Sequence, residues 1–440
     1  MRLSGWGRYP ILECRAVSPA NEGELREHLQ LGPVIARGNG RSYGDSALQP
    51  QATVLMHRFN HMLGFDAATG LLVCESGILL RDVLDVFVPR GFFPPVTPGT
   101  KFVTIGGMIA ADVHGKNHHQ AGSFGSHVEW LDVMVGDGSI QRCSATENAD
   151  LFTRTIGGMG LTGIILRAAF RLMPVETAYI RQETIAADNL AAVMDAFEDS
   201  QRWTYTVAWI DCLAAGARLG RSLLYRGEHA GRDELPAGLR DQPFTLPRGR
   251  VTRVPVDFPA AALNRWTVRV FNELYYRKGA RATGHRIVDY DTYFYPLDGI
   301  LEWNRIYGRR GLVQYQCVLP KAAGGEALTR LLRQIGAAGR GSFLAVLKLF
   351  GRQSGLLSFP MEGYTLALDF PVSTRTLKLL DELDEIVLEY NGRLYLAKDA
   401  RMQAATFERG YPGATAFRVA RARSGAARAF ASHQSQRLGL

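Results

Sequence analysis

The feature that most restricts the fold of this chain is a glycine-rich turn that follows a short apolar run. Residues 33–37 have the composition of a buried strand, and they lead into residues 36–46, which read ARGNGRSYGDS. Glycine lets backbone N–H groups approach a phosphate without a Cβ in the way. The spacing is not GxGxxG and no amphipathic helix follows directly, so a Rossmann dinucleotide turn fits poorly. Taken alone, the segment is either a phosphate cradle or an ordinary glycine-rich turn.

A second segment rich in small residues covers residues 98–115. Within it, residues 106–111 read GGMIAA at the point where a helix would start. A helix N-terminus built from small residues presents free N–H groups to a pyrophosphate. Two such segments in one chain suit a dinucleotide better than a mononucleotide.

The chain has 440 residues, 46% of them hydrophobic, which is enough for one large or two ordinary domains. Residues 1–175 alternate strand and helix patterns, as in an α+β domain. A second section starts near Pro174, and its pattern fits a sheet with helices packed on one face. Strands are expected at residues 33–37, 53–57, 71–75, 128–135, 139–144, 162–173, 205–211, 312–318, 343–350 and 364–370. Helices are expected at residues 21–30, 78–88, 150–156, 190–200, 325–337 and 374–390.

Basic residues are concentrated in two regions of the chain. The total of 51 Lys and Arg against 42 Asp and Glu gives a formal charge of +9, and the excess falls in residues 218–281 and 418–440. Residues 227–262 are also poor in apolar periodicity, which predicts one long loop that is either functional or disordered. The basic regions are either solvated surfaces or surfaces that meet phosphates or an anionic membrane.

Several functional classes fit the sequence poorly. The five cysteines are far apart and form no CxxC pair, so a disulfide framework or a thiolate metal site is not expected. His114, His118 and His119 lack a carboxylate or thiolate that would complete a familiar metal site, so no metal is expected. We see no signal peptide and no apolar run long enough to span a bilayer, which predicts a cytoplasmic protein, at most peripheral at the inner membrane.

The two glycine segments, taken with the run HGKNHHQAGSFG at residues 114–125, resemble the vanillyl-alcohol-oxidase class of FAD enzymes. Within that class the sequence is most similar to the decaprenylphosphoryl-ribose 2′-oxidase family, and the resemblance covers nearly the whole chain. It implies a two-domain α+β fold: a PCMH-type FAD-binding domain at 1–176, an antiparallel-sheet substrate domain at 177–392, and a segment at 393–440 that returns to the FAD domain. The other matching motifs are GLTGIIL at 160–166, YPLD at 295–298, WNR at 303–305, QYQ at 314–316 and RLYLAKD at 393–399.

The resemblance also implies which residues hold the cofactor. They are Ala36, Arg37, Gly38, Asn39, Gly40, Arg41, Ser42, Tyr43, Gly44, Asp45, Ser46, Gly99, Thr104, Ile105, Gly106, Gly107, His114, Asn117, Ile164 and Tyr395. Relatives with covalently attached flavin usually carry a histidine where this chain has Arg41. Because an arginine does not form that bond, we expect FAD to be held noncovalently.

On the substrate side the resemblance implies Lys116, Trp209, Tyr295, Gln314, Gln316, Lys348, Thr365 and Lys398. Gln314 and Gln316 alternate on an expected strand, so both side chains should point to one face and can orient sugar hydroxyls. The catalytic candidates are Lys398, Tyr43 and His114. Lys398 can stabilise negative charge on the reduced flavin or, if desolvated, accept the hydroxyl proton, and Tyr43 is a second candidate for proton handling.

The family resemblance implies oxidation of the 2′-hydroxyl of a polyprenyl-phosphoryl-β-D-ribose to a ketone, with hydride transfer to flavin N5. A separate NAD(P)H-dependent short-chain reductase would complete the epimerisation to the arabinose form. The loop at 227–262 would act as a mobile lid over the lipid, and the basic segments could lie on an anionic membrane. The alternatives are an oxidase of a soluble sugar, alditol or aldonolactone, and a basic protein that binds nucleic acid or anionic lipid without catalysis. No familiar nucleic-acid motif is present, so a nucleic-acid partner is not expected.

The Arg41 substitution gives a direct prediction about the flavin. Acid or heat denaturation of the purified protein should release all the yellow colour into the supernatant, which absorbance spectra of supernatant and pellet will show. Colour that stays with the precipitated chain would contradict noncovalent binding.

Overall fold

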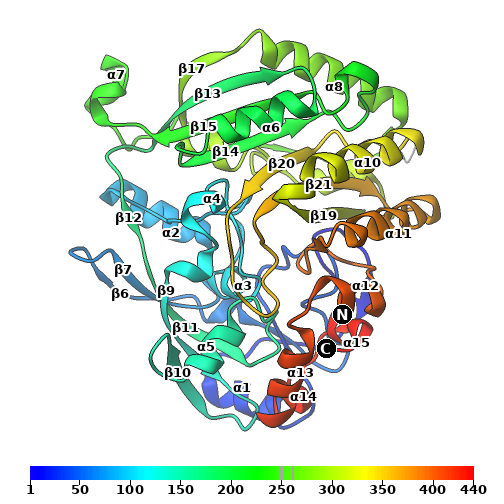
Figure 1. The fold of residues 1–440 in the computed structure, drawn as a ribbon. Coiled ribbons are helices and arrows are strands. Elements are labelled where there is room, and N and C mark those ends of the chain that lie inside the picture. Colours follow the sequence, from blue (N-terminus) through cyan, green and yellow to red (C-terminus); the bar gives the residue numbers. More distant parts are fainter. Residues whose placement is uncertain (248–250, 260–261) are drawn as a thin grey trace.

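The structure is a computed structural model that describes residues 1–247, 251–259 and 262–440. Its lower half in Figure 1 contains the first part of the chain together with the C-terminal helices. Its upper half is built on one large sheet formed by the middle of the chain. No helix in these described ranges is both long enough and apolar enough to cross a bilayer.

The lower half contains two larger sheets besides short two-stranded ones. A three-stranded parallel sheet has the order β3-β5-β4, and a five-stranded antiparallel sheet has the order β10-β9-β11-β7-β6. The strands are β3 (Ala16–Val17), β4 (Ile35–Arg37), β5 (Thr53–Leu55), β6 (Met62–Asp66), β7 (Leu71–Glu75), β9 (Val128–Met134), β10 (Ile140–Ser144) and β11 (Ile164–Arg171). The helices are α1 (Glu22–Leu29), α2 (Leu80–Phe87), α3 (Ile105–Ala110), α4 (His118–Ala121) and α5 (Ala149–Thr155). Because Leu80, Val83, Leu84 and Phe87 recur at helical spacing, α2 buries all four side chains in one core.

The upper half is an eight-stranded sheet in which every neighbouring pair is antiparallel. This arrangement confirms the predicted fold class, α+β with an antiparallel-sheet substrate domain. The strands, in their spatial order, are β17 (Gly284–Asp289), β13 (Tyr179–Ala187), β15 (Ser222–His229), β14 (Tyr205–Ile210), β20 (Ala345–Phe350), β21 (Gly363–Pro371), β19 (Leu312–Pro320) and β22 (Arg393–Leu394).

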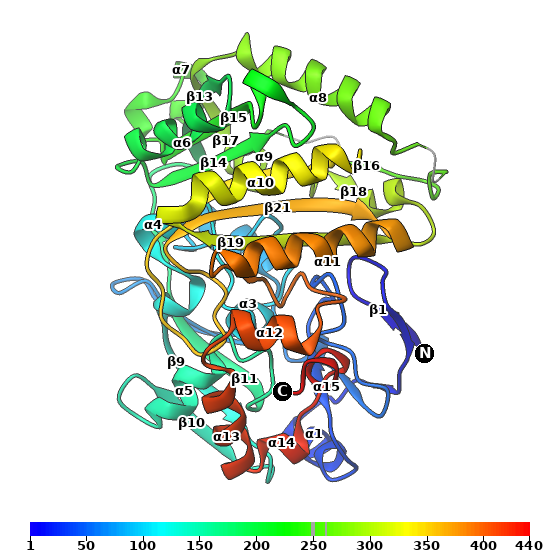
Figure 2. The same cartoon turned by 45° about the vertical axis from the view of Figure 1, so that its right-hand side comes forward.

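One face of this sheet is apolar and covered by helices. Side chains alternate between the two faces of a strand, so Leu347, Leu366 and Leu368 share a face, and all are fully buried. They pack against α6 (Leu190–Asp199), α10 (Gly324–Ala337) and α11 (Thr374–Glu389) in the largest core of the molecule. Figure 2 shows α10 and α11 lying along β21 and β19.

The expectation that helices cover only one face was wrong for the far end of the sheet. Helix α8 (Arg265–Ala280), which the sequence analysis missed, packs on the opposite face of β15 and β14. Its Gly279 lies against Leu223, and its Tyr275 ring centroid is 4.8 Å from that of Trp209. The apolar residues of α8 are not arranged in one inward stripe, because only Val268 and Asn272 are buried, and so its pattern was hard to assign.

The prediction of one long loop at residues 227–262 was also wrong in part, because short helices and strands occupy parts of it. Residues 227–229 complete β15, and the segment continues through the short helices η5 (Arg232–Glu234) and α7 (Ala237–Arg240) to the strand β16 (Thr252–Arg253). Main-chain and side-chain bonds hold it, since Ala178 donates to the Pro243 carbonyl and Arg8 pairs with Asp257. Residues 248–250 and 260–261 lie outside the described residues.

The end of the chain returns to the lower half. Helices α12 (Ala404–Gly410), α13 (Ala414–Arg423), α14 (Ala426–Ala429) and α15 (His433–Leu438) follow β22, and Figure 2 shows α14 beside α1. Phe430 bridges to Val34, and Gln49 donates to the Ala431 carbonyl at 3.0 Å. Two of these residues also bury their side chains in the core beneath the parallel sheet: Val34 and Phe430 are fully buried there.

Candidate active site

The uncovered face of the central strands is polar. Strand pairing places Gln314 opposite Asp369, Gln316 opposite Ala367, and Lys348 opposite Thr365, so these side chains share one face with Trp209. This is the face opposite to the one that packs on α6, α10 and α11. Five of the eight residues predicted on the substrate side thus share one face of four neighbouring strands. This face looks toward the lower half, where it meets His114.

A buried amine lies where this face meets the first glycine segment. Lys398 Nζ lies 4.1 Å from the centre of the Tyr43 ring, and the Tyr43 amide donates to the Ala397 carbonyl at 3.0 Å. Burial lowers the pKa of Lys398, which the Asp369 carboxylate opposes and the charge of Lys348 reinforces. Burial likewise raises the pKa of Asp369. The pKa values of the amine and the carboxylate are therefore closer together than in water, so that a proton can transfer between them at a smaller cost in free energy.

Tyr43 and Gln314 complete this cluster. Gln314 Nε2 donates to Asp369 Oδ1 at 2.6 Å, which fixes the carboxylate on the sheet. Burial raises the pKa of Tyr43 well above its usual value, and the nearby Asp369 charge raises it further. The Tyr43 side chain is therefore a protonated hydroxyl at neutral pH.

His114 links the sheet to the lower half. Its Nε2 lies 3.0 Å from Nε2 of Gln316, which also donates to Thr365 Oγ1 at 3.2 Å. Burial lowers the pKa of His114 well below its usual value, with Lys348 and His118 adding to the effect, so the ring is neutral. Because the Gln316 amide is a donor, the His114 proton sits on Nδ1, which is buried without a hydrogen-bond partner among the described residues.

Two further amines are buried nearby. Lys116 donates to the Tyr293 carbonyl and lies 4.1 Å from the centre of the Tyr293 ring. Burial lowers the pKa of Lys116 to about 7, and the charge of Lys348 contributes. Burial lowers the pKa of Lys348 to about 8. Both amines would regain a full positive charge if an anion bound beside them.

The two glycine segments meet in space. Asn39 Nδ2 donates to the Phe102 carbonyl at 2.7 Å, and Gly38 lies so close to Thr104 that a Cβ would stand 2.1 Å from Thr104 Oγ1. Thr104 also caps α3, because its Oγ1 accepts from the Gly107 amide at 3.2 Å. Gly40 has a φ of +61°, a conformation that favours glycine.

The residues present fit an FAD molecule. Besides His114 Nδ1, Asn117 Oδ1 is buried with no partner among the described residues, although Asn117 Nδ2 donates to the Pro95 carbonyl at 2.7 Å. One orphaned donor and one orphaned acceptor, close together in sequence, match the mixed donor and acceptor edge of a flavin ring. Because Gly38 has no Cβ, the two glycine segments come close together here, and their backbone N–H groups could bind a diphosphate.

Other predicted residues have mainly structural contacts. Arg37 donates to the Ser4 carbonyl at 2.7 Å, and the Ile105 and Ile164 side chains are fully buried in two cores. Trp209 Nε1 donates to the Phe343 carbonyl at 3.0 Å, and the Tyr295 hydroxyl pairs with Thr97. Gly99 has no neighbouring atom within 4 Å of a Cβ. The predicted cofactor residues Ala36, Ser42, Gly44, Ser46 and Gly106 also lie within the two segments just described.

Two site residues were missed in the sequence. Asp369 is a buried carboxylate in the otherwise apolar strand TLALDF, and an acid in such a strand is a usable signal. Asp298 accepts from the Lys101 amide at 2.8 Å and acts electrostatically on Arg41, whose guanidinium lies 4.1 Å from the centre of the Trp6 ring. The described residues bring together no group of three or more His, Cys, Asp or Glu side chains that could hold a metal ion.

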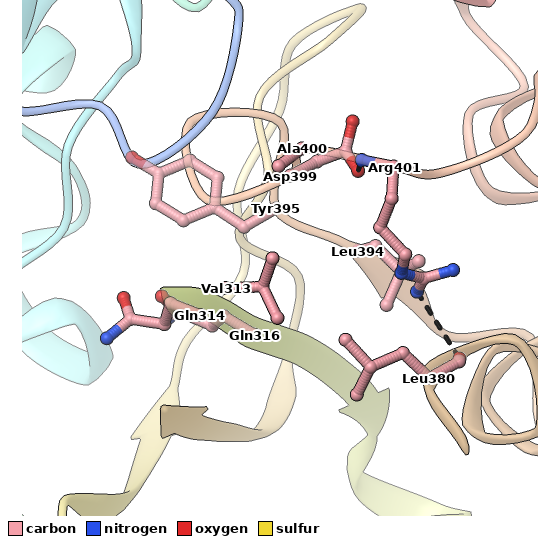
Figure 3. Close-up of a pocket in the computed structure, with 9 residues that line it drawn as sticks. All are labelled: Val313, Gln314, Gln316, Leu380, Leu394, Tyr395, Asp399, Ala400 and Arg401. Carbon is pink, nitrogen blue, oxygen red and sulfur yellow. Dashed lines mark hydrogen bonds between the residues drawn. The ribbon is translucent and has the colours of Figure 1, made fainter. Parts of the chain in front are cut away.

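A small pocket lies between β19, α11 and the segment that carries Lys398. Figure 3 shows Gln314 and Tyr395 at one end and Arg401 at the other. Tyr395 donates to the Ala111 carbonyl at 3.1 Å and stacks on Phe359 with 4.5 Å between ring centroids. Arg401 pairs with Asp384 at 2.6 Å and donates to the Leu380 carbonyl at 3.3 Å. These contacts attach the Lys398 segment to the end of α3 and to α11.

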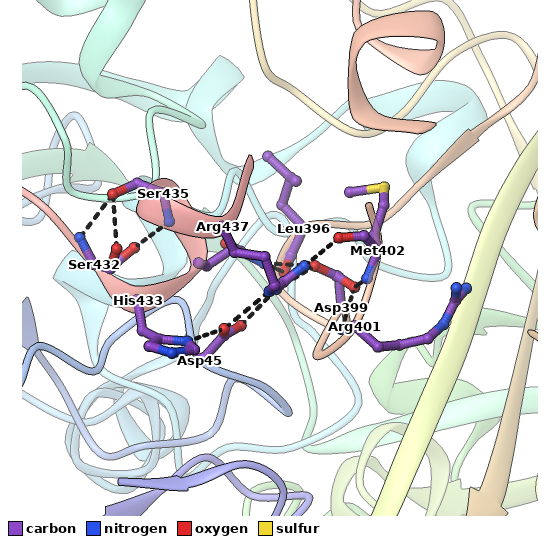
Figure 4. Close-up of polar contacts among 10 residues, drawn as sticks. Asp45, Leu396, Asp399, Arg401, Met402, Ser432, His433, Ser435 and Arg437 are labelled. Atoms are coloured by element: carbon purple, nitrogen blue, oxygen red, sulfur yellow. Dashed lines mark hydrogen bonds and ion pairs between the residues drawn. The ribbon is translucent and has the colours of Figure 1, made fainter. Parts of the chain in front are cut away.

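Figure 4 shows a buried ion cluster that connects three distant segments. Arg437 on α15 pairs with Asp45 of the first glycine segment at 2.8 Å and with Asp399 at 2.8 Å. His433 adds a 2.7 Å bond to Asp45. Burial alone would raise the pKa of Asp45, but the bonds from His433 and Arg437 outweigh it and hold the pKa below its usual value. Tyr43 lies two residues before Asp45, and Lys398 lies directly before Asp399. The cluster therefore holds Tyr43 and Lys398 against each other.

Comparison with known proteins identifies the family. A model of an FAD binding domain matches residues 15–144. Over 428 residues the chain is 38% identical to decaprenylphosphoryl-β-D-ribose oxidase of Mycolicibacterium smegmatis, a match that covers 93% of this chain and 91% of the relative. The chain belongs to the decaprenylphosphoryl-β-D-ribose oxidase family. It is an FAD-dependent oxidoreductase, as the resemblance of the glycine segments predicted.

More distant relatives match only part of the oxidase chain. L-gulonolactone oxidase of Mus musculus is 30% identical over 183 residues, which cover 39% of this chain and 41% of the relative. Cytokinin dehydrogenase 5 of Arabidopsis thaliana is 33% identical over 151 residues, which cover 32% and 27%. These two partial matches therefore bear less on the middle of the chain than the near-full-length match does.

The ion cluster gives a prediction about stability. Arg437→Met removes the guanidinium that pairs with both buried carboxylates and leaves Asp45 with His433 alone, so the free energy of unfolding should fall by about 3–5 kcal/mol. Denaturant unfolding measures this change. Arg423→Met, at an exposed position on the same C-terminal segment, is the matched control and should change stability by less than about 0.5 kcal/mol. Equal stabilities of the two variants would show that the cluster contributes nothing.

The contact between the glycine segments gives a prediction about cofactor binding. Gly38→Ala forces Thr104 to move, which removes the cap of α3, so FAD affinity should fall roughly tenfold or more, or about 1.4 kcal/mol. Fluorescence titration of the apoprotein with FAD measures the affinity, and circular dichroism checks the fold. Gly64→Ala, where a Cβ meets nothing within 4 Å, should bind FAD like the unsubstituted protein. Unchanged affinity of Gly38→Ala would place the diphosphate elsewhere.

Proposed function

We propose that this enzyme oxidises the 2′-hydroxyl of a polyprenyl-phosphoryl-β-D-ribose to the ketone, the first half of an epimerisation to the arabinose form. The observation that supports this proposal is the buried Lys398 amine beside Tyr43 and the Asp369–Gln314 pair, at the polar face of the large sheet. The chain's membership of the decaprenylphosphoryl-β-D-ribose oxidase family supports the substrate. The reaction removes a hydride from the carbinol carbon and a proton from its hydroxyl. Bound FAD supplies the hydride acceptor.

The protein's own residues manage the proton. We assign Lys398 as the group that accepts it, because burial lowers the pKa of this amine and keeps part of the population neutral near neutral pH. Asp369 offsets the positive charge that then forms. Tyr43 stays protonated and donates a hydrogen bond to a sugar oxygen.

Other residues position the sugar, the phosphate and the flavin. The Gln316 amide is held by Thr365 and His114, so it can position a sugar hydroxyl at a fixed place on the sheet. Lys348 and Lys116 provide positive charge for the phosphate of the substrate. The His114 Nδ1 proton and the Asn117 carbonyl would hold the flavin ring, with the glycine segments at its diphosphate and Arg41 leaving it noncovalently bound. The division into residues 1–176, 177–392 and 393–440 is the corresponding domain proposal.

The ketone product requires a second enzyme. We propose an NAD(P)H-dependent short-chain reductase as the partner that reduces it from the opposite side. The alternative substrate class, a soluble sugar, alditol or aldonolactone, is supported by partial matches to lactone oxidases such as L-gulonolactone oxidase. Anaerobic mixing tests both, because polyprenyl-phosphoryl ribose should bleach the flavin absorbance and L-gulonolactone should not. Bleaching by the lactone alone would overturn the proposal.

The assignment of Lys398 gives a prediction about pH dependence. Lys398 is active when neutral, so activity should fall as pH drops through its pKa. Lys398→Met should lower kcat by roughly 10²–10⁴-fold with FAD content unchanged. In Lys348→Met the neighbouring positive charge is gone, so the pKa of Lys398 should rise and the acid-side loss of kcat should move to higher pH.

Stopped-flow bleaching across a pH series measures both effects. The control is Lys378→Met, an exposed lysine on α11, which should leave the pH profile unchanged. A Lys398→Met enzyme with full activity, or a Lys348→Met profile that does not move, would remove Lys398 from the proton-accepting role.

A further inference from the structure

Helix α8 exposes an apolar stripe on the surface of the upper half. Trp266, Val270 and Leu274 recur every four residues and therefore lie on one side of the helix. Their exposed fractions are 70%, 60% and 64%, and the neighbouring Phe271 is 41% exposed. Large apolar side chains in an unbroken row over two turns are unusual on a free surface, which indicates that something covers them.

The helix itself is firmly seated, so the stripe is not a product of poor packing. Its inner side places Val268 in the main core, and the Asn272 amide donates to Asp211 at 2.7 Å. Tyr275 packs on Trp209, and Phe271 lies with its ring centroid 5.5 Å from that of Phe343. Asn264 caps the helix through bonds from the Trp266 and Thr267 amides. The exposed row is therefore held outward by a rigid element.

Basic side chains border the stripe. Helix α8 carries Arg265 and Arg269 near its start and Arg277 and Lys278 in its last turn, against a single acid, Glu273. That acid is already engaged, because it pairs with Arg221 at 2.8 Å and with Arg277 at 2.6 Å. The surface around the apolar row is thus positively charged.

A groove beside the stripe strengthens this charge. Its walls are α8, α10 and the loop around residue 216, and Arg265, Arg269 and Arg333 all line it. The lining contains no acidic residue, and in the described part of the chain no carboxylate pairs with any of these three arginines. Three guanidinium groups around one groove are suited to the phosphate of a lipid headgroup.

We propose that α8 docks the protein on the surface of an anionic lipid bilayer, with Trp266, Val270 and Leu274 inserted below the headgroups and Arg265, Arg269 and Arg333 on lipid phosphates. A helix with a row of apolar side chains and a basic border is the arrangement that lies in the plane of a membrane interface. A protein partner would need acidic residues opposite the same arginines and an apolar groove for the row. The bilayer supplies both features at once.

The position of α8 connects this surface to the active site. Tyr275 of α8 contacts Trp209, whose neighbours on the same face of the sheet include Lys348. A docked enzyme would therefore hold the Trp209 end of the polar face of the sheet near the bilayer in which a polyprenyl chain resides. This inference rests in part on the proposed lipid-linked substrate, and vesicle binding is measured independently of turnover.

Co-sedimentation of the FAD-loaded full chain with vesicles tests the proposal. Binding should be strong to vesicles of equal parts phosphatidylglycerol and phosphatidylcholine, weak to phosphatidylcholine alone, and reduced by added salt. Combined substitution Trp266→Ser, Val270→Ser and Leu274→Ser should lower the partition coefficient at least tenfold, as should Arg265→Gln, Arg269→Gln and Arg333→Gln together. The matched control replaces the exposed Ile11, Leu63 and Val419 with Ser and should bind like the unsubstituted protein.

Turnover of farnesyl-phosphoryl-β-D-ribose in free solution is measured in parallel, and it should be equal in all these proteins. The docking proposal is overturned if the unsubstituted protein ignores anionic vesicles, if it binds neutral vesicles equally well, or if the α8 variants bind as it does. It is also overturned if the α8 substitutions instead abolish self-association without vesicles. Vesicle binding without turnover of the soluble substrate would contradict the proposed function and leave the docking surface intact.

Discussion

The active site depends on one buried contact, the pairing of Arg437 with both Asp45 and Asp399. Each carboxylate belongs to a segment that carries a site residue, and neither segment has regular structure of its own at that point. Two buried anions would repel each other. The Arg437 guanidinium pairs with both of them and so holds the two segments together. The chain also comes very close here, since a Cβ on Gly44 would stand 1.9 Å from the Asp399 carbonyl oxygen.

The large sheet separates two environments by strand alternation alone. Its apolar side chains meet three helices, and its polar ones are left buried under the lower half, where water is scarce. Lys348, Lys398 and Asp369 therefore lie where charge is costly, and their proton affinities shift toward one another. Burying these groups together does not favour stability. The strands that build the core on one face therefore carry the reactive groups on the other.

The local features could be predicted from the sequence, whereas the features that arise from long-range packing could not. The strand expected at residues 71–75 is β7 to the residue, and the family and its cofactor followed from the motifs. Helix α8 was missed because its burial is set by the sheet that it crosses and its outer side is apolar. Asp369 was missed because its importance comes from Lys398, which lies on a different segment and is brought close only by the fold.

The distance along the chain between Asp45 and Arg437 has a consequence for biosynthesis. These partners are separated by 392 residues, so a ribosome must make all the residues between them before they can meet. Until then Val34, which α14 and the residues after it cover in the finished molecule, remains open to solvent. The contact that holds Tyr43 and Lys398 together can therefore form only after Arg437 has been made, so the site between them is completed late in synthesis.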